Sequence, residues 1–251
     1  MSLDQFFVSI KDDIEQDLNR KSSLQEIEHQ FDLTLIPYKS IINEWINCSP
    51  THLSSSIIEK GASGQTIYEN YHKYKSLILD LDCKPSQKER FLSKFLEDSI
   101  YILVANRYFL SIANGFITDP IEIPMITNTV SDVGVIMNPN EVAEILFLDK
   151  IDYQSYLLAL LRLVDTIVEY TTTTVINESV GSSGAKSANY SISIINSQIV
   201  SKLQNGFQLL DLKNDMLRKR YDSLKYNSQR LNKIVYDLSL RNLITTKGEV
   251  I

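Results

Sequence analysis

Apolar residues recur in steps of three and four along long stretches of this chain, a spacing that places them on one face of an α-helix. The first such stretch, residues 2–20, carries Leu3, Phe6, Phe7, Ile10, Ile14 and Leu18. Turn-forming residues rarely interrupt the pattern, because the 251 residues include only 8 Gly and 6 Pro. The sequence therefore predicts an all-α fold, with about seven helices in one antiparallel bundle and a single domain over residues 1–251.

Capping signals indicate where several helices begin. Three pairs of residues have the spacing of a capping box: Ser23 and Glu26, Ser86 and Glu89, and Asn138 and Glu141. Together with the apolar spacing, these signals predict helical stretches over about 2–20, 23–46, 52–82, 86–113, 138–148, 152–176, 190–211 and 214–241. Pro37 is expected to kink the second stretch. The segments near 114–137 and 177–189 are predicted to be flexible loops.

The charge balance limits the classes of partner. The formal net charge is −6 and the isoelectric point is about 5.2, so the chain as a whole is not a strongly basic polyanion binder. Any nucleic-acid site must be local or assembled from several subunits. The start of the chain lacks the basic region of a signal peptide, and we expect a protein without a membrane association, cytoplasmic and possibly also nuclear.

Metal and cofactor signals are weak. Cys48 and Cys83 lack metal-ligand spacing and are expected to be reduced thiols. His29, His52 and His72 are far apart and form no i,i+4 pair. We therefore predict neither a metal site nor a cofactor.

Six leucines near the C-terminus lie seven residues apart: Leu203, Leu210, Leu217, Leu224, Leu231 and Leu238. A leucine zipper also requires apolar residues between the leucines, and here most of those positions are polar. The interpretation that we favour is that the leucines contribute to the core of an antiparallel bundle. A helix break at "LKND" is also expected, with Asn214 as a new cap.

A basic cluster lies within "LKNDMLRKRYDSLKY", residues 212–226. Arg218, Lys219 and Arg220 could bind phosphates. They could equally form a solvated face with salt bridges, because Asp222 lies four residues after Arg218 and Asp215 four before Lys219. From the chemistry of these residues alone, the salt-bridged face is favoured.

Aromatic residues in the first third of the chain have two interpretations. The side chains are Trp45, Tyr68, Tyr71 and Tyr74. They could stack on single-stranded bases. Packing in the core or at a subunit interface is favoured, because aromatic residues are common in both.

The same C-terminal region resembles a known family. "GFQLLDLKNDMLRKRYDSLKYNSQRLNKIVYDLSLRNL", Gly206 to Leu243, is very similar to the C-terminal segment of the translin family. "PSQKERF", "NEVAEIL" and "SISIINSQIVSKLQNGF" fall in the expected order upstream. The resemblance implies a seven-helix antiparallel bundle of the translin type that assembles into a closed octamer. It also implies binding of single-stranded RNA or DNA.

The resemblance further implies a catalytic partner. In the family's mixed complex, known as C3PO, a translin-associated factor X-like paralogue supplies the catalytic acids of an endoribonuclease. Two of these acids would fall near Tyr101 and Val104, neither of which can ligate Mg²⁺ as a carboxylate does. Glu97 and Asp98 lie one turn earlier and are expected to be surface acids. The chain is therefore predicted to be a non-catalytic subunit with no catalytic residues of its own.

The basic stretch of the family's fourth helix is only partly present. Lys88, Arg90 and Lys94 remain, with Phe91 and Phe95 between them. Leu96, Glu97 and Asp98 occupy later positions that the family keeps basic. The predicted nucleic-acid-binding residues are Lys88, Arg90, Lys94, Arg218, Lys219 and Arg220. Because each missing phosphate contact weakens binding, an alternative function is a helical scaffold with little residual nucleic-acid affinity.

Overall fold

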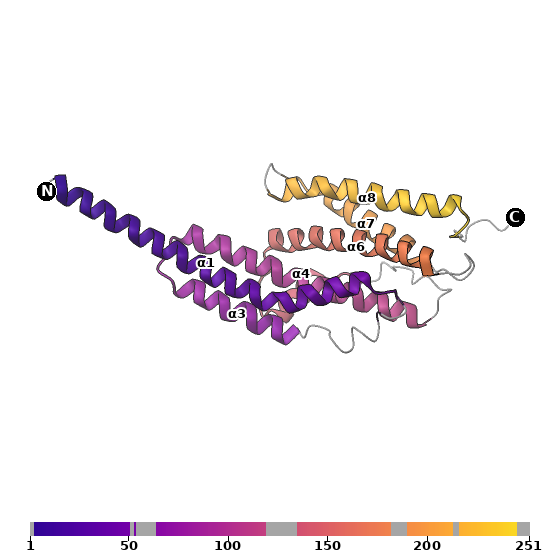
Figure 1. Ribbon diagram of the computed structural model, residues 1–251, viewed down its shortest axis with the longest axis horizontal. Helices are drawn as coiled ribbons and strands as arrows, with labels where there is room; N and C mark the ends of the chain where they lie inside the picture. Colours follow the sequence, from indigo (N-terminus) through magenta and orange to yellow (C-terminus); the bar gives the residue numbers. More distant parts are fainter. Residues whose placement is uncertain are drawn as a thin grey trace.

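Seven helices and no strand make up the part of the chain that the structure describes, which confirms the predicted all-α fold (Figure 1). The computed structural model describes residues 3–50, 53, 64–118, 135–181, 190–212 and 216–244. The helices are α1 (Leu3–Asn47), α3 (Gly64–Asp80), α4 (Pro85–Thr118), α5 (Pro139–Ile145), α6 (Tyr153–Gly181), α7 (Ser191–Gln208) and α8 (Met216–Leu240).

Helices α4 and α6 form the centre of the bundle. They pack along each other, α1 and α3 cover α4, and α7 and α8 cover α6 (Figure 1). Every residue from Ile100 to Ala105 of α4 is buried, as expected for a helix that is apolar on most sides. Trp45 of α1 packs against Phe109 of α4, and the Phe109 ring meets Tyr170 of α6 edge to face at 5.3 Å. This aromatic cluster joins the central pair of helices to α1.

The first two predicted helices are one continuous helix of 45 residues, so the predicted helix start at Ser23 is wrong. The Ser23 hydroxyl donates to the Asn19 carbonyl, 3.1 Å away, and does not cap a new helix. The next residue, Leu24, is 2 % exposed, and its packing favours continuation of the helix. The helix also continues through Pro37. Its N-terminal half projects beyond the rest of the bundle (Figure 1).

Most other described helix boundaries agree with the sequence to within about five residues. The third predicted stretch, 52–82, is described as a helix from Gly64, and its predicted start lies outside the described residues. The capping box of α5 is present: the Asn138 side chain accepts from two backbone N–H groups, and the Glu141 side chain accepts from the Asn138 N–H at 2.7 Å. Helix α4 begins at Pro85, one residue before the predicted cap. Helices α4 and α6 continue through Thr118 and Gly181, which shortens the two predicted connections at their N-terminal ends.

The leucines near the C-terminus belong mainly to the bundle core, as the favoured interpretation predicted. Leu217, Leu224, Leu231 and Leu238 of α8 are buried where α8 packs on α6 and α7. Leu203 is half-buried and Leu210 is exposed. The predicted cap at Asn214 lies outside the described residues.

Two sequence expectations about the whole chain can be compared with the described part. Cys48 and Cys83 are both free thiols. Among the described helices, none has a run of residues long and apolar enough to cross a bilayer.

A chain of hydrogen bonds crosses the core between α4, α7 and α6. The Tyr108 hydroxyl donates to Asn196 Oδ1 at 2.9 Å, and Asn196 Nδ2 donates to Thr171 Oγ1 at 2.8 Å. Thr171 Oγ1 in turn donates to the Ile167 carbonyl at 2.7 Å. All three side chains that form these bonds are buried, so each polar atom depends on its neighbour for a partner.

We predict that Asn196→Ala lowers the free energy of unfolding by about 2–4 kcal/mol, because it leaves the buried Tyr108 hydroxyl without its acceptor. Urea unfolding monitored by circular dichroism measures the change. Asn232→Ala is the matched control, since it removes one exposed hydrogen bond from Ser197 and should cost less than about 1 kcal/mol. Equal losses in the two variants would contradict the prediction.

Candidate nucleic-acid interface

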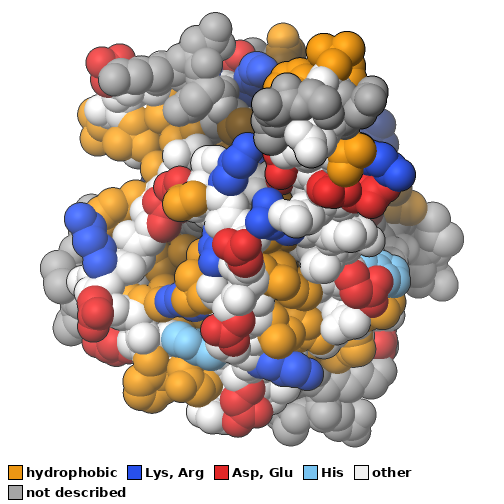
Figure 2. All heavy atoms as spheres, turned by 90° about the vertical axis from the view of Figure 1, so that its left-hand side faces the viewer, with side chains coloured by type: hydrophobic (Ala, Val, Ile, Leu, Met, Phe, Trp, Pro, Cys, Tyr) orange, Lys and Arg blue, Asp and Glu red, His pale blue; other side chains and the backbone are white. Residues whose placement is uncertain are grey.

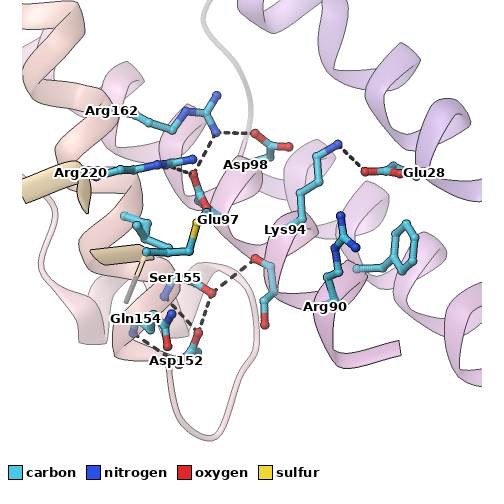
Figure 3. A pocket seen from close by; sticks show the side chains of 14 residues that line it. Glu28, Arg90, Lys94, Glu97, Asp98, Asp152, Gln154, Ser155, Arg162 and Arg220 are labelled. Carbon is cyan, nitrogen blue, oxygen red and sulfur yellow. Dashed lines mark hydrogen bonds and ion pairs between the residues drawn. The ribbon is translucent and has the colours of Figure 1, made fainter. Parts of the chain in front are cut away.

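The six predicted binding residues lie on two helices that meet at one pocket. Lys88, Arg90 and Lys94 belong to the first third of α4, and Arg218, Lys219 and Arg220 to the start of α8. A pocket of about 450 Å³ brings Arg90, Lys94 and Arg220 together (Figure 3). The other three predicted residues do not line this pocket.

We call this cavity the charged pocket, because cationic and anionic side chains line it in equal number. Its cations and anions come from α1, α4, α6, α8 and the segment before α6: Arg90, Lys94, Arg162 and Arg220, and Glu28, Glu97, Asp98 and Asp152. Positive and negative side chains are likewise interspersed on the molecular face shown in Figure 2. The pocket therefore carries no formal excess of positive charge to attract a phosphate.

Asp98 and Glu97 are not surface acids, which corrects the expectation from the sequence. Asp98 is 4 % exposed and accepts a hydrogen bond from the Arg162 guanidinium. Glu97 accepts from Arg220 Nη1 at 2.6 Å and lies 3.6 Å from Arg162 Nη1. Glu97 is paired with α8 and α6, and Asp98 with α6 and α1, so the charges of both acids are compensated inside the bundle (Figure 3).

Arg162 is the residue that holds the two acids on α4. Its guanidinium lies 4.2 Å from the centre of the Tyr101 ring, in a cation–π arrangement. Burial lowers the pKa of Arg162, but the charge of Asp98 and their hydrogen bond outweigh burial and raise it. Arg162 is therefore permanently charged and committed to its carboxylate partners.

The same pattern of alternating charges continues to α1. Lys39 Nζ lies 3.9 Å from Asp98 Oδ1 and 4.0 Å from Asp32 Oδ1. Lys94 Nζ donates to Asp32 at 3.0 Å and to Glu28 at 2.7 Å. We call the whole series the ion-pair chain: Arg220, Glu97, Arg162, Asp98, Lys39, Asp32, Lys94 and Glu28. It links α8, α4, α6 and α1.

Lys94 and Lys88 are occupied by partners within the chain. Burial lowers the pKa of Lys94, but its hydrogen bonds to Glu28 and Asp32 outweigh burial and raise the pKa above its usual value. Lys88 Nζ donates to the Leu79 carbonyl at 2.7 Å. A phosphate that bound either ammonium would have to compete with these contacts.

Arg90 and Lys219 differ from the other predicted residues. Both are exposed, and neither has an ion-pair partner among the residues that the structure describes. Arg90 lines the charged pocket, and Lys219 precedes Arg220 on α8. Arg218, by contrast, lies 3.9 Å from Asp222, as the salt-bridge interpretation predicted. Asp215, the partner that it predicted for Lys219, lies outside the described residues. Arg90 and Lys219 are thus the cations best placed to meet a phosphate without breaking an ion pair.

The aromatic residues are mostly core residues. Phe95 is fully buried and stacks on Phe31 of α1 at 4.2 Å, so it is not accessible to a base. Trp45, Tyr71 and Tyr74 are also buried, and the half-buried Tyr68 packs against His72 and Phe147, which agrees with the packing interpretation. Phe91 is half-buried and lines the charged pocket. Among the aromatics considered from the sequence, Phe91 is therefore the candidate for stacking beside Arg90.

The two positions where catalytic acids would fall lie in the core. Val104 is fully buried, and the Tyr101 hydroxyl is hydrogen bonded to Thr166 Oγ1 of α6 at 2.9 Å. Burial raises the pKa of Tyr101, so its phenol is neutral at physiological pH. Within the described ranges, no group of three or more His, Cys, Asp or Glu side chains is arranged to hold a metal ion.

The second half of the chain, from the end of α4 to the end of α8, matches a recognised family. The model of the translin family matches residues 116–242, just over half of the chain. The chain belongs to the translin family.

Curated relatives match over a shorter stretch. Translin of Gallus gallus is 55% identical over 47 residues, which is 19% of this chain and 20% of the relative. Translins of Homo sapiens and Mus musculus are each 56% identical over 45 residues, 18% of this chain and 20% of the relative. The matched stretch thus spans about a fifth of the length of these relatives.

Sequence reasoning missed Arg162 and the burial of Asp98. A signal for Arg162 was present, because it is a single cation inside the apolar run "YLLALLRLV" of α6. A cation in such a run is seldom buried without an anionic partner, so the search for that partner would have pointed to an acid on another helix. Spacing along the chain does not say which acid it is, since Asp98 and Arg162 are 64 positions apart.

We predict that Asp98→Asn lowers the free energy of unfolding by about 2–3 kcal/mol, because it leaves the Arg162 charge without its main partner. Urea unfolding at constant ionic strength measures the loss. Asp222→Asn is the matched control: its contact to Arg218 is exposed and should contribute at most about 0.5 kcal/mol.

The double variant Asp98→Leu with Arg162→Met should recover at least half of that loss, because no charge is then left unpaired. Stability that stays unchanged in Asp98→Asn would show that the ion pair does not hold α4 to α6.

Proposed function

We propose that this chain is a single-strand nucleic-acid-binding subunit of an oligomeric translin-type assembly. The observation that carries the proposal concerns two exposed cations without ion-pair partners among the described residues. Arg90 lines the charged pocket, and Lys219 immediately precedes the pocket residue Arg220 on α8. Membership of the translin family supports the same class of ligand. The curated translins support it through one short stretch alone, since the match covers a fifth of their length.

The contacts would be few and sensitive to salt. Arg90 and Lys219 would bind phosphates directly, and Phe91 would stack on a base beside Arg90. Arg220 and Lys94 would join only where a phosphate displaces Glu97 or Glu28 from them. A single subunit would therefore bind weakly, and useful affinity would come from several subunits that hold one strand together.

The proposed role in RNA processing is accessory. Tyr101 and Val104 cannot ligate Mg²⁺ as carboxylates do, and Glu97 and Asp98 are tied to Arg220 and Arg162. A translin-associated factor X-like paralogue would supply the catalytic acids in a C3PO-like complex, and the homo-oligomer would be an octamer. We place this activity in the cytoplasm, with a second pool in the nucleus.

A second candidate function is a helical scaffold with little nucleic-acid affinity. The balance of charges in the pocket favours it, since four of the predicted cations already have intramolecular partners. Nucleic-acid-binding measurements on variants that lack Arg90 and Lys219 separate the two candidates. The loss of these cations would not change the nucleic-acid affinity of a scaffold.

We predict that the double variant Arg90→Ala with Lys219→Ala binds a labelled single-stranded RNA roughly thirtyfold more weakly at low salt, since each of the two exposed phosphate contacts contributes on the order of 1 kcal/mol. The slope of log K against log salt should fall by about 1.4, the value for two contacts on a single strand. Fluorescence anisotropy at several salt concentrations measures both quantities.

Lys233→Ala is the matched control, because it removes one exposed cation from the distant half of α8. Its affinity should stay within about twofold of the unmodified chain. Lys94→Ala should also lose stability, since it leaves Glu28 and Asp32 unpaired, so it is a poorer probe of binding. RNA affinity that is absent in the unmodified chain at low salt would support the scaffold instead.

We predict that the purified chain does not cleave single-stranded RNA in the presence of Mg²⁺, because the two positions expected to carry metal-binding acids are Tyr101 and Val104. Gel analysis of end-labelled RNA, with and without a chelator, measures this. Cleavage that requires Mg²⁺ and co-purifies with the chain at constant specific activity would refute the non-catalytic assignment.

A further inference from the structure

The projecting half of α1 carries an exposed apolar stripe. Its members recur at helical spacing and are 37–73 % exposed: Leu3, Phe6, Phe7, Ile10, Ile14 and Leu18. The described part of the chain leaves them uncovered, because this half of the helix extends past the other helices (Figure 1). Figure 2 views the molecule from the end at which α1 projects. We call these six residues the α1 stripe.

The α1 stripe continues the face of α1 that is buried farther along the helix. From Leu24 onward the same succession of three- and four-residue steps passes through Phe31 and Leu35, both fully buried against the bundle. The apolar surface of α1 therefore does not end where the bundle ends. Its uncovered part has the composition of a packed helix face and lacks only the opposing helix.

The exposed apolar area of the stripe is unusually large for a monomer. From their exposed fractions, the six side chains present on the order of 600 Å² of apolar surface, which is at the upper limit for monomeric proteins. A single unsupported helical segment of this length is also only marginally stable in water. Two copies of the stripe in contact would remove on the order of 1,200 Å², within the range of stable specific interfaces.

The geometry points to a second copy of the same segment as the occupant: we propose that two α1 stripes pair antiparallel about a two-fold axis. The apolar positions support this symmetry. An axis between Ile10 and Ile14 places each of them opposite the other in the partner copy, and it places Phe6 opposite the partner copy's Leu18. A surface that is complementary to itself in this way is what a two-fold interface requires.

The charges on the rest of the segment argue against other occupants. Residues 3–22 contain five acids and three bases, and the acids dominate the polar face. Helices that lie on membranes carry Lys and Arg there, because lipid surfaces are anionic. A nucleic acid is disfavoured for the same electrostatic reason. An apolar face with an acidic surround fits a protein helix, and the segment offers its own copy as a match.

This pairing deepens the assembly part of the proposed function by assigning one of its interfaces to named residues. It does not depend on nucleic-acid binding, because the charged pocket contains residues of α1 no nearer to the stripe than Glu28. The mass of the assembly and its RNA affinity are separate measurements, so the failure of one proposal is distinguishable from the failure of the other.

The first test is the mass of the full-length protein by light scattering coupled to size exclusion. Phe7→Asp combined with Ile14→Asp should reduce the mass at least twofold, because the contact would bury two or more charges per copy. The helical content of the bundle should persist, since both side chains are exposed in the single chain. Val8→Asp is the matched control: Val8 is 58 % exposed but lies outside the stripe on another side of the helix, so the mass should stay unchanged.

The second test is chemical cross-linking that reports the antiparallel geometry. In a background with Cys48→Ser and Cys83→Ser, Ile10→Cys should form covalent dimers in high yield with a short bismaleimide, because Ile10 lies near the proposed axis. Val8→Cys in the same background should remain a single chain on a denaturing gel.

Four outcomes would overturn the proposal. The first is an unmodified chain that stays monomeric at all concentrations, and the second is a mass that Phe7→Asp with Ile14→Asp does not change. The third is a loss of mass in that double variant while Ile10→Cys forms no cross-link. The fourth is flotation of the unmodified chain with anionic vesicles that the double variant abolishes. The third would place the stripe against another surface of the second copy, and the fourth would assign it to a membrane.

Discussion

The ion-pair chain is the constraint on which the charged pocket depends. It begins with Arg220 on α8, passes through Glu97, Arg162 and Asp98 at the centre of the bundle, and ends on α1. Apolar packing between α4 and α6 brings these helices together, but packing alone does not specify where charged side chains go. Asp98 is buried, so its partner must be present for the helices to approach at this level. The ion-pair chain therefore sets both the register of the helices and the electrostatics of the pocket.

Because acids within the chain compensate many of its cations, a cluster of basic residues in this sequence is not by itself a polyanion site. Six cations in two sequence clusters suggest a polyanion site, yet four of them already hold partners within the chain. Each phosphate contact made by those four must replace an existing contact, so its net contribution is small. Among the six, only Arg90 and Lys219 have neither an ion pair nor a side-chain hydrogen bond with another described residue, since Lys88 donates to the Leu79 carbonyl. Such a subunit favours binding in which several copies contribute one or two contacts each.

The α1 helix extends the same reasoning to assembly. Helix α1 has 45 residues, whereas α3, which packs beside it, has 17, and the excess length of α1 is apolar on one side. Within one chain this excess is unfavourable, since it exposes apolar surface and orders a segment without burying it. Contact with a second copy reverses that balance. Helix α1 thus contributes Glu28 to the charged pocket and carries the α1 stripe nearer its N-terminus. Each of these two surfaces would need further subunits to be complete.

Local patterns in the sequence determined the class of fold, because helix periodicity, scarce Gly and Pro and the Asn138 capping box act between residues a few positions apart. They also determined that Leu217, Leu224, Leu231 and Leu238 form a buried face. The cap signal at Ser23 failed because tertiary packing of Leu24 outweighs a local hydrogen bond. Only the tertiary structure decided which charges pair: Arg220 and Glu97 are 123 positions apart, and their contact follows from how α4 and α8 cross the bundle. The sequence does not distinguish a charged residue that is solvated from one that is buried, so the partner of a charged residue is known only once the helices have packed.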